Sequence, residues 1–316
     1  MSKPKNKFNP ARYGDYTSLV KGARRRARRE STSARERIWA ALPDDCFFPG
    51  ASFEASILGD NSIPKKTYCP SVADLPIMCR LLGLFPHRHG SRITMIPSAG
   101  MYMDLPTPAT RLTVKTPSPS SFGYNIGAED EAQHKAHHIT SELFPALFGA
   151  PERHLHIEAN SQSLSFPYRL DTQVFTPDTG SFSDDGRIVL PESERIVTLE
   201  YKTDKSKPWS KLWKRQLFMP IMSAKQQHPS AQVLGLIVIA RSKLFRGTDL
   251  APASLVDCYL VDAPSDDIID TSIIAATRVT ITSGPAHTRH SDYFQAPRPK
   301  RSSLLPSIDS LLAAHS

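Results

Sequence analysis

The stretch that decides the fold is residues 195–203, RIVTLEYKT, in which apolar and polar side chains alternate. This alternation is typical of a β-strand, because successive side chains of a strand point to opposite faces of its sheet. Val197, Leu199 and Tyr201 are therefore expected to face a core. Glu200 and Lys202 share the other face, where a carboxylate and an ammonium group two residues apart form a candidate catalytic pair.

Residues 165–175, which precede this strand, alternate in the same way and place Asp171 on their polar face. The segment that follows, TPDTGSFSDDGR (residues 176–187), is dense in turn-forming residues. Such a segment between two strands predicts a hairpin. If the two strands pair, Asp171 lies beside Glu200.

Two neighbouring carboxylates repel each other, and a cation between them relieves the repulsion. Mg²⁺, or Mn²⁺ in its place, suits a site of oxygen ligands, and the carbonyl group of Tyr201 is a candidate third oxygen. Lys202 is placed to lower the pKa of an attacking water or to stabilise charge that develops on a phosphate. Together these groups predict hydrolysis of phosphodiester bonds.

Regular elements surround this pair of strands. The pattern predicts a helix over residues 127–148, a strand over 154–159, a second helix over 207–227, a buried strand over 231–240 and a further strand over 255–261. The second helix is long enough for a right-handed parallel crossover. The expected fold class is α/β, a small mixed central sheet flanked by helices.

This order of elements, with Asp171 and then Glu200-x-Lys202, resembles the PD-(D/E)XK nuclease superfamily, which has a restriction-endonuclease-like αβββαβ core. The resemblance implies a metal-dependent nuclease that favours DNA, with Asp171 and Glu200 as metal ligands and Lys202 assisting the water. It also implies a supporting ligand, Glu142, on the first helix and an orienting Gln216 on the second. It covers about 125 residues, and the 28 residues between Asp171 and Glu200 are more than is usual.

The N-terminal arm, residues 1–37, carries 12 Lys/Arg and 3 Asp/Glu, so the rest of the chain holds 27 basic and 28 acidic residues. Such an arm is expected to be disordered when free. A basic run binds polyanions by releasing their counterions, which predicts contact with nucleic acid. A nuclear-import signal and a solvated tail are the open alternatives. The basic run comprises Lys21, Arg24, Arg25, Arg26, Arg28 and Arg29.

The remaining chain divides into three parts by composition. Residues 38–122 form an N-terminal region, entered by a helix that Ser33 and Glu36 cap and closed by a Pro/Ser-rich linker at 104–122. Residues 123–265 form the nuclease-like domain. Residues 266–316 form an extension whose final amphipathic segment either docks onto a protein partner or frays.

Four cysteines in 316 residues do not form a disulfide framework. Zinc at Cys69, Cys79, His87 and His89 is not favoured, because their spacing matches no usual zinc motif. Histidines 134, 137 and 138 could hold a metal but are more typical of a polar surface. No apolar stretch approaches the length of a membrane span, so we expect no membrane contact and an intracellular protein, nuclear in a eukaryote and otherwise cytoplasmic.

Three functions stay open at this point. The favoured one is a Mg²⁺-dependent nuclease. The second is a nucleic-acid-binding or regulatory protein that keeps the fold without cutting. The third is a partner-binding protein that docks through residues 1–122 and its C-terminal segment. The sequence contains no glycine-rich phosphate loop and no nucleophile elbow, and it leaves the oligomeric state open.

Overall fold

The computed structural model describes residues 14–59, 67–116, 143–148, 155–158, 161–163, 165–170, 173–176, 181–203, 209–241 and 253–283. These residues belong to two compact units. Unit 1 comprises Met1–Tyr102, Phe175–Gly180 and Lys211–Trp213, and unit 2 comprises Met103–Val174, Ser181–Ser210 and Lys214–Ser316. No helix in the described ranges is long and apolar enough to cross a membrane.

Unit 1 consists of short helices and a small antiparallel sheet in the order β1-β3-β2. Its helices are α1 (Gly14–Glu30), α2 (Ala34–Ala41), η2 (Asp44–Phe47), η3 (Ala55–Leu58), η5 (Val72–Asp74) and α4 (Ile77–Leu82). Its strands are β1 (Ser52–Glu54), β2 (Leu84–His89), β3 (Arg92–Pro97) and β13 (Lys211–Trp213), and β4 (Tyr102–Asp104) begins at its boundary.

Helix α1 corrects the prediction of disorder for the described part of the arm from residue 14 onward. Val20, Ala23 and Ala27 recur three and four residues apart, so that they form one apolar stripe between the arginines. All three are buried in the main cluster of unit 1. The basic run, apart from Arg24, is therefore the outer part of an amphipathic helix.

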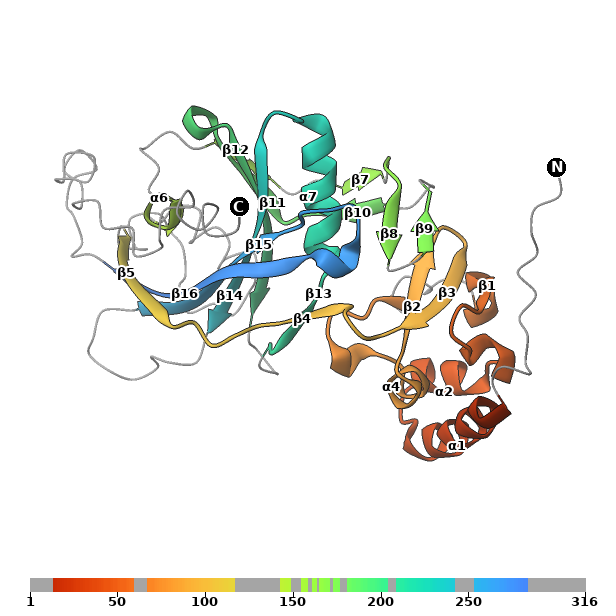
Figure 1. The fold of residues 1–316 in the computed structure, drawn as a ribbon. Helices are drawn as coiled ribbons and strands as arrows, with labels where there is room; N and C mark the ends of the chain where they lie inside the picture. The colour runs from red at the N-terminus through yellow and green to blue at the C-terminus, as the bar shows by residue number, and fades with distance from the viewer. Residues whose placement is uncertain are drawn as a thin grey trace, which may run out of the picture. The chain divides into compact units, whose positions relative to one another are not determined.

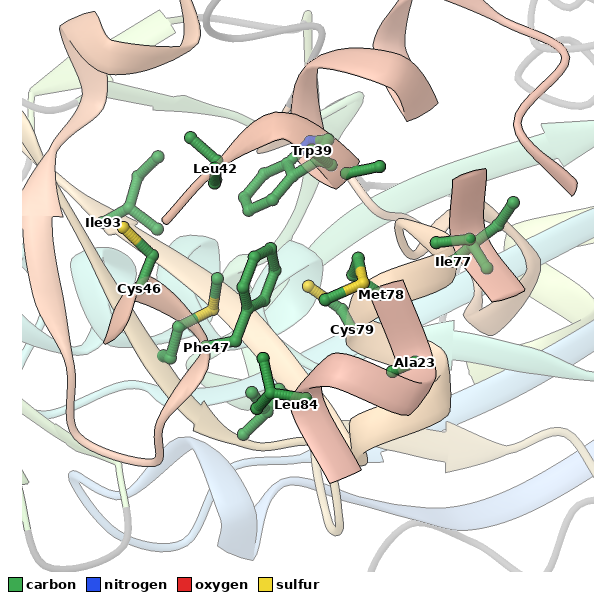
Figure 2. Close-up of a cluster of buried hydrophobic side chains, with 14 of the residues drawn as sticks. Ala23, Trp39, Leu42, Cys46, Phe47, Ile77, Met78, Cys79, Leu84 and Ile93 are labelled. Atoms are coloured by element: carbon green, nitrogen blue, oxygen red, sulfur yellow. The ribbon is translucent and has the colours of Figure 1, made fainter. Parts of the chain in front are cut away.

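The centre of unit 1 is an apolar cluster in which side chains from several helices and two strands meet (Figure 2). Trp39 from α2 and Phe47 from η2 lie with their ring centroids 6.5 Å apart. Helix α2 begins as predicted, because the Ser33 hydroxyl accepts a hydrogen bond from the Glu36 amide at 3.2 Å. The Glu36 carboxylate accepts from the Ile77 amide of α4 at 2.9 Å. That bond ties α2 to α4.

Unit 2 is built on a seven-stranded mixed sheet in the order β5-β16-β15-β14-β12-β11-β6 (Figure 1). Two neighbouring pairs, β12 with β14 and β16 with β5, are parallel, and the others are antiparallel. The strands are β5 (Thr110–Thr116), β6 (Leu155–Glu158), β11 (Gly186–Leu190), β12 (Arg195–Thr203), β14 (Gln232–Arg241), β15 (Ala253–Asp262) and β16 (Ser272–Ser283). The expected α/β class with a mixed central sheet is confirmed.

Two helices cover opposite faces of this sheet. Helix α6 (Leu143–Phe148) contributes Leu143, Phe144 and Leu147 to an apolar cluster that also holds Val197, Leu199 and Tyr201 of β12. Helix α7 (Arg215–Gln227) lies against the other face, over β12 and β14 (Figure 1). Gly235 permits this approach, since an added Cβ would stand 3.0 Å from side-chain atoms of Leu217 and Ile221.

Unit 2 also contains short elements between β6 and β11 and before β16. They are β7 (Ser161–Ser163), β8 (Tyr168–Leu170), β9 (Gln173–Phe175), β10 (Ser181–Ser183), η7 (Pro191–Ser193) and η8 (Ile268–Asp270). Strands β7 and β10 pair antiparallel. The single strand expected over residues 165–175 is thus divided into two short ones.

Several predicted boundaries differ from the structure. The linker expected at 104–122 contains β5, and the extension expected from 266 contains β16, so the large sheet reaches beyond 123–265 on both sides. The second helix begins at Arg215 rather than 207 and continues through Pro220. Of the first helix, expected over 127–148, residues 143–148 are described and are helical.

Candidate functional site

Strand β12 directs its two kinds of side chain to opposite faces of the sheet, as its alternation predicts. Its odd-numbered apolar residues lie in the core under α6, and burial holds the pKa of the Tyr201 hydroxyl well above its usual value. Glu200 and Lys202 lie on the α7 face. The Glu200 side chain is nevertheless buried, with 5% of the residue exposed.

Two donors hold the Glu200 carboxylate. Lys202 Nζ lies 2.5 Å from Glu200 Oε1, and Gln216 Nε2 donates to the same oxygen at 2.8 Å. Gln216 stands in the first turn of α7, so the close packing of that helix at Gly235 determines where its amide lies. A buried carboxylate is costly unless charge and hydrogen bonds compensate it, and here both do.

Asp185 brings a second carboxylate to this place. It directly precedes β11, and its amide donates to the Leu199 carbonyl at 3.0 Å. Its Oδ2 accepts from the Tyr201 amide at 2.7 Å. Asp185 is therefore bonded to the main chain on both sides of Glu200. A carboxylate has about four lone-pair sites, so one amide bond leaves capacity for a cation.

Asp184 has a different role. It is 2% exposed and accepts from Arg187 Nε at 2.8 Å, while Arg187 Nη1 donates to the side chain of Gln227 at 3.0 Å. This buried ion pair anchors the start of β11 to the last turn of α7. It thereby fixes the turn that presents Asp185.

Lys202 is held by an aromatic neighbour as well as by Glu200. Its Nζ lies 6.0 Å from the centroid of the Trp209 ring, at the limit of a cation–π contact. The Trp209 indole donates to the Thr203 carbonyl at 3.1 Å, which ties the ring to the end of β12. Trp209 thus lies beside the ammonium group at the C-terminal end of β12.

The structure brings together Glu200, Lys202 and Gln216 of the predicted site. Asp171 and Glu142 lie outside the described residues. The expected pairing of residues 165–175 with the Glu200 strand is wrong, because β12 pairs with β11 on one side and β14 on the other.

The carboxylate that lies beside Glu200 in the structure is one that the sequence analysis missed. Asp185 was assigned to a turn, although the apolar run GRIVL that follows it marks a buried strand. This apolar run indicates a strand, but the turn-forming residues before it are so dense that the whole segment resembles a turn.

Within the described ranges no group of three or more His, Cys, Asp or Glu residues could hold a metal ion. The two carboxylates at this point are those of Asp185 and Glu200, and the carbonyl group of Tyr201 is the third oxygen that the sequence suggests. Mg²⁺ is commonly bound by one or two carboxylates and completes its shell with water and substrate phosphate. Asp185, Glu200 and Lys202 together carry a formal charge of −1, which favours a cation.

The basic run divides into inner and outer side chains. Arg24 points inward, where its Nε donates to Asp44 at 2.9 Å and its Nη1 to the Ala40 carbonyl at 2.7 Å. Arg26 pairs with Glu30 at 2.6 Å. The exposed cations of α1 that make neither of these pairs are Lys21, Arg25, Arg28 and Arg29.

The four side chains considered for zinc are spread through unit 1. Cys69 and Cys79 are buried thiols, and burial raises the pKa of Cys69 to about 11. His87 meets the ring of Phe175 edge-on and His89 lies tilted against it, with centroids 4.6 and 5.3 Å away. The thiols pack as small apolar groups and the imidazoles as aromatic ones.

Comparison of the chain with protein-family models, with curated proteins and with solved structures found no match.

Proposed function

We propose that the chain is a metal-dependent nuclease that hydrolyses phosphodiester bonds of nucleic acid, with DNA as the favoured substrate. The observation that carries the proposal is the buried Glu200 carboxylate, which Lys202 and Gln216 both contact and which Asp185 flanks. A buried carboxylate with a specific charge partner is a candidate functional group.

The order of elements supports the same function. With the short strands β7 to β10 and β13 between them left aside, the main elements come in the order α6, β6, β11, β12, α7 and β14, and β12 and β14 are parallel. This is the αβββαβ order of the PD-(D/E)XK superfamily that the sequence resembles. The resemblance places an acidic residue on the strand paired with Glu200-x-Lys202. The sequence resemblance gives this role to Asp171, which lies outside the described residues; we propose Asp185, directly before β11, in its place.

In this proposal Asp185 and Glu200 hold Mg²⁺ or Mn²⁺. The bound metal would lower the pKa of its water and polarise the phosphoryl group. The water oxygen forms a bond to phosphorus, one ester P–O bond breaks, and the departing oxygen takes up a proton. Lys202 stabilises the negative charge that develops on the phosphate, and Gln216 holds the Glu200 carboxylate in place.

The exposed face of α1 gives the proposed nuclease a second contact with its substrate. Lys21, Arg25, Arg28 and Arg29 present four cations on one helix, and polyanions bind such surfaces without sequence preference. We propose that DNA binds this face of α1. Recognition by the nuclear-import machinery is the alternative, and it needs an experiment separate from the cleavage assay.

A second candidate function follows from the ion pair itself. Lys202 already neutralises Glu200 at 2.5 Å. A protein that binds nucleic acid without cutting needs no metal there, and such a pair would serve it as a structural clamp. The two candidates differ in one measurable property, metal-dependent cleavage.

The deciding experiment incubates the full chain with single- and double-stranded DNA and RNA, in Mg²⁺, in Mn²⁺ and in EDTA. We expect cleavage with either metal and none in EDTA. Glu200→Gln, Lys202→Ala and Asp185→Asn should each lower the rate by about 100-fold or more, since each removes a group that acts on the metal or the phosphate. Asp171→Asn, measured alongside Asp185→Asn, tests the metal ligand that the sequence resemblance implies.

The control is Glu194→Gln, which removes an exposed charge just before β12 without touching the site. It should cut like the unmodified protein. Binding of all four nucleic acids with no cleavage in any metal would overturn the nuclease and favour the second candidate. Full activity in Glu200→Gln would place the chemistry elsewhere.

A further inference from the structure

A row of charged side chains crosses the large sheet at the level of Lys202. The strand register aligns Lys202 of β12 with Ile239 of β14, Ile239 with Asp257 of β15, Asp257 with Arg278 of β16, and Arg278 with Arg111 of β5. Residues aligned in this way lie on the same face of a sheet. The row therefore runs along one sheet face to the edge strand, with the buried, apolar Ile239 between Lys202 and Asp257.

Asp257 organises the middle of this row. Its carboxylate is 0% exposed and accepts from Arg278 Nε at 2.7 Å and Arg278 Nη2 at 3.0 Å. It also accepts from Arg241 Nε at 2.9 Å. A guanidinium group that holds a carboxylate through Nε and one Nη turns its remaining edge away from it. Asp257 thus fixes the guanidinium plane of Arg278 through two bonds and holds Arg241 through one.

Among the residues that the structure describes, the ion pairs of this cluster join two cations to one anion. Arg241 and Arg278 carry two positive charges against the one negative charge of Asp257. Arg111, which is exposed, adds a third cation directly opposite Arg278 on the neighbouring strand. Like charges on neighbouring strands repel each other. An anion bound over the row would turn this repulsion into attraction.

A purely structural reading explains Asp257 but leaves Arg111 unexplained. A buried ion pair adds little stability compared with apolar residues of the same size, because removing the charges from water is costly. Arg111 makes the arrangement less favourable still in the absence of an anion. The row is therefore better explained by a ligand than by stability.

We infer that Arg241, Arg278 and Arg111 bind successive phosphates of a nucleic-acid strand that passes over the Glu200 site. This inference rests on the proposed function, because it assigns the substrate's path on the same sheet face. From Lys202 to Arg111 there are four strand spacings, roughly 19 Å. With a rise of about 3.4 Å per nucleotide, this length matches five or six nucleotides of one strand.

The test measures binding separately from cleavage. Fluorescence anisotropy of labelled 12-nucleotide single- and double-stranded DNA is recorded in EDTA over a series of salt concentrations, for the full chain and for Arg111→Gln, Arg111→Glu and Arg278→Gln. We expect a several-fold loss of affinity for each Gln variant and a larger loss for Arg111→Glu. The slope of log K against log salt should fall by about one for each phosphate contact removed.

Arg195→Gln is the matched control, since Arg195 lies at the opposite end of β12 and donates to Gln232 at 2.7 Å. It should bind DNA like the unmodified chain. Arg111 is exposed, so its variants fold even if Arg278→Gln does not. Unchanged affinity and salt slope in both Arg111 variants overturn the inference, as does an equal loss in Arg195→Gln.

The two proposals can fail independently. If the chain cuts DNA and the Arg111 variants bind normally, the path is wrong and the nuclease stands. If the Arg111 variants lose affinity and no metal supports cleavage, the row binds nucleic acid and the nuclease is wrong.

Discussion

Unit 1 and unit 2 bury different kinds of side chain. The cluster at the centre of unit 1 is apolar, and the basic residues of α1 lie on its outer face apart from Arg24. Unit 2 buries the charged side chains Asp184, Arg187, Glu200 and Asp257 within or beside its sheet. Burial of charge costs stability unless partners compensate it, so unit 2 carries a cost that unit 1 avoids.

This difference indicates where function is concentrated. Three of the buried acidic groups lie at the start of β11 or on the α7 face of the sheet, while the opposite face under α6 is apolar. A sheet that needed only stability would be apolar on both covered faces. The polar face is therefore the one on which we expect chemistry and binding.

Removal of Asp257 should have the largest effect on stability. Asp257→Ala leaves the guanidinium groups of Arg241 and Arg278 beside each other without their shared carboxylate, which should cost roughly 3–5 kcal/mol. Hydrogen exchange of the full chain would show faster exchange in peptides of β14 to β16 and little change in unit 1. An equal rise in exchange rates in both units would contradict the view that the buried charges of Asp257 and its partners stabilise unit 2 alone.

The triple variant Asp257→Leu with Arg241→Met and Arg278→Leu is the companion measurement. Since it replaces all three charges by apolar groups, it should recover most of that stability. By the inferred phosphate path it should still bind DNA weakly. Recovery of stability together with normal DNA affinity would assign the cluster a structural role.

Arg24 and Arg25 should separate structure from binding on α1. Arg24→Ala removes bonds to Asp44 and to the Ala40 carbonyl, so it should destabilise unit 1 by roughly 1–3 kcal/mol. Arg25→Ala, one residue further on an exposed position, should leave stability unchanged and lower DNA affinity with a smaller salt slope. Thermal unfolding and anisotropy measure the two effects, and equal destabilisation by both variants would contradict the assignment of an outer face.

The cysteines give the smallest effect, a dependence on pH. Burial raises the pKa of Cys46 and of Cys69 from 9.0 to about 11. At pH 8 their thiolate fraction, and with it the rate of alkylation by iodoacetamide, should be roughly 100-fold below that of an unfolded thiol. Peptide mass spectrometry with and without urea measures this ratio, and rapid labelling of the folded chain would show that unit 1 opens readily.

The same shifts predict how stability changes with pH. A pKa that is higher in the folded state means that the folded chain keeps its proton between about pH 9 and 11 while the unfolded chain loses it. The contribution of these thiols is therefore present below pH 9 and is lost as pH rises to 11. Because three of the four cysteines are in unit 1, the loss should be steeper there.

Strong local patterns were sufficient to predict much of unit 2. The alternation of residues 195–203 and the apolar run from 231 both fold as strands, β12 and β14, and Gln216 on the helix between them contacts Glu200 as expected. Each of these predictions depends on a periodicity that one segment carries by itself. Where the sequence analysis went wrong, the deciding contacts lie far apart along the chain.

Strand β5 and helix α1 illustrate such contacts. The segment that contains β5 is rich in Pro, Ser and Thr and has the composition of a linker, yet β5 is held by parallel pairing with β16, more than 150 residues away. Helix α1 has the charge of a disordered arm, yet three of its apolar residues are buried in the apolar cluster of unit 1. Neither partner is visible in the local sequence.

The strand that carries Glu200 and Lys202 shows which features the local sequence determines and which depend on tertiary packing. The sequence by itself determined that the two side chains share one face of a strand, because the two-residue period of a strand is a local property. Only the tertiary structure decided which carboxylate lies beside them, since the register of neighbouring strands depends on packing across the whole sheet. That packing replaced the expected strand with β11 and brought Asp185 to Glu200. It also aligned Arg278 and Arg111 with Lys202, from segments that the sequence separates by more than 150 residues.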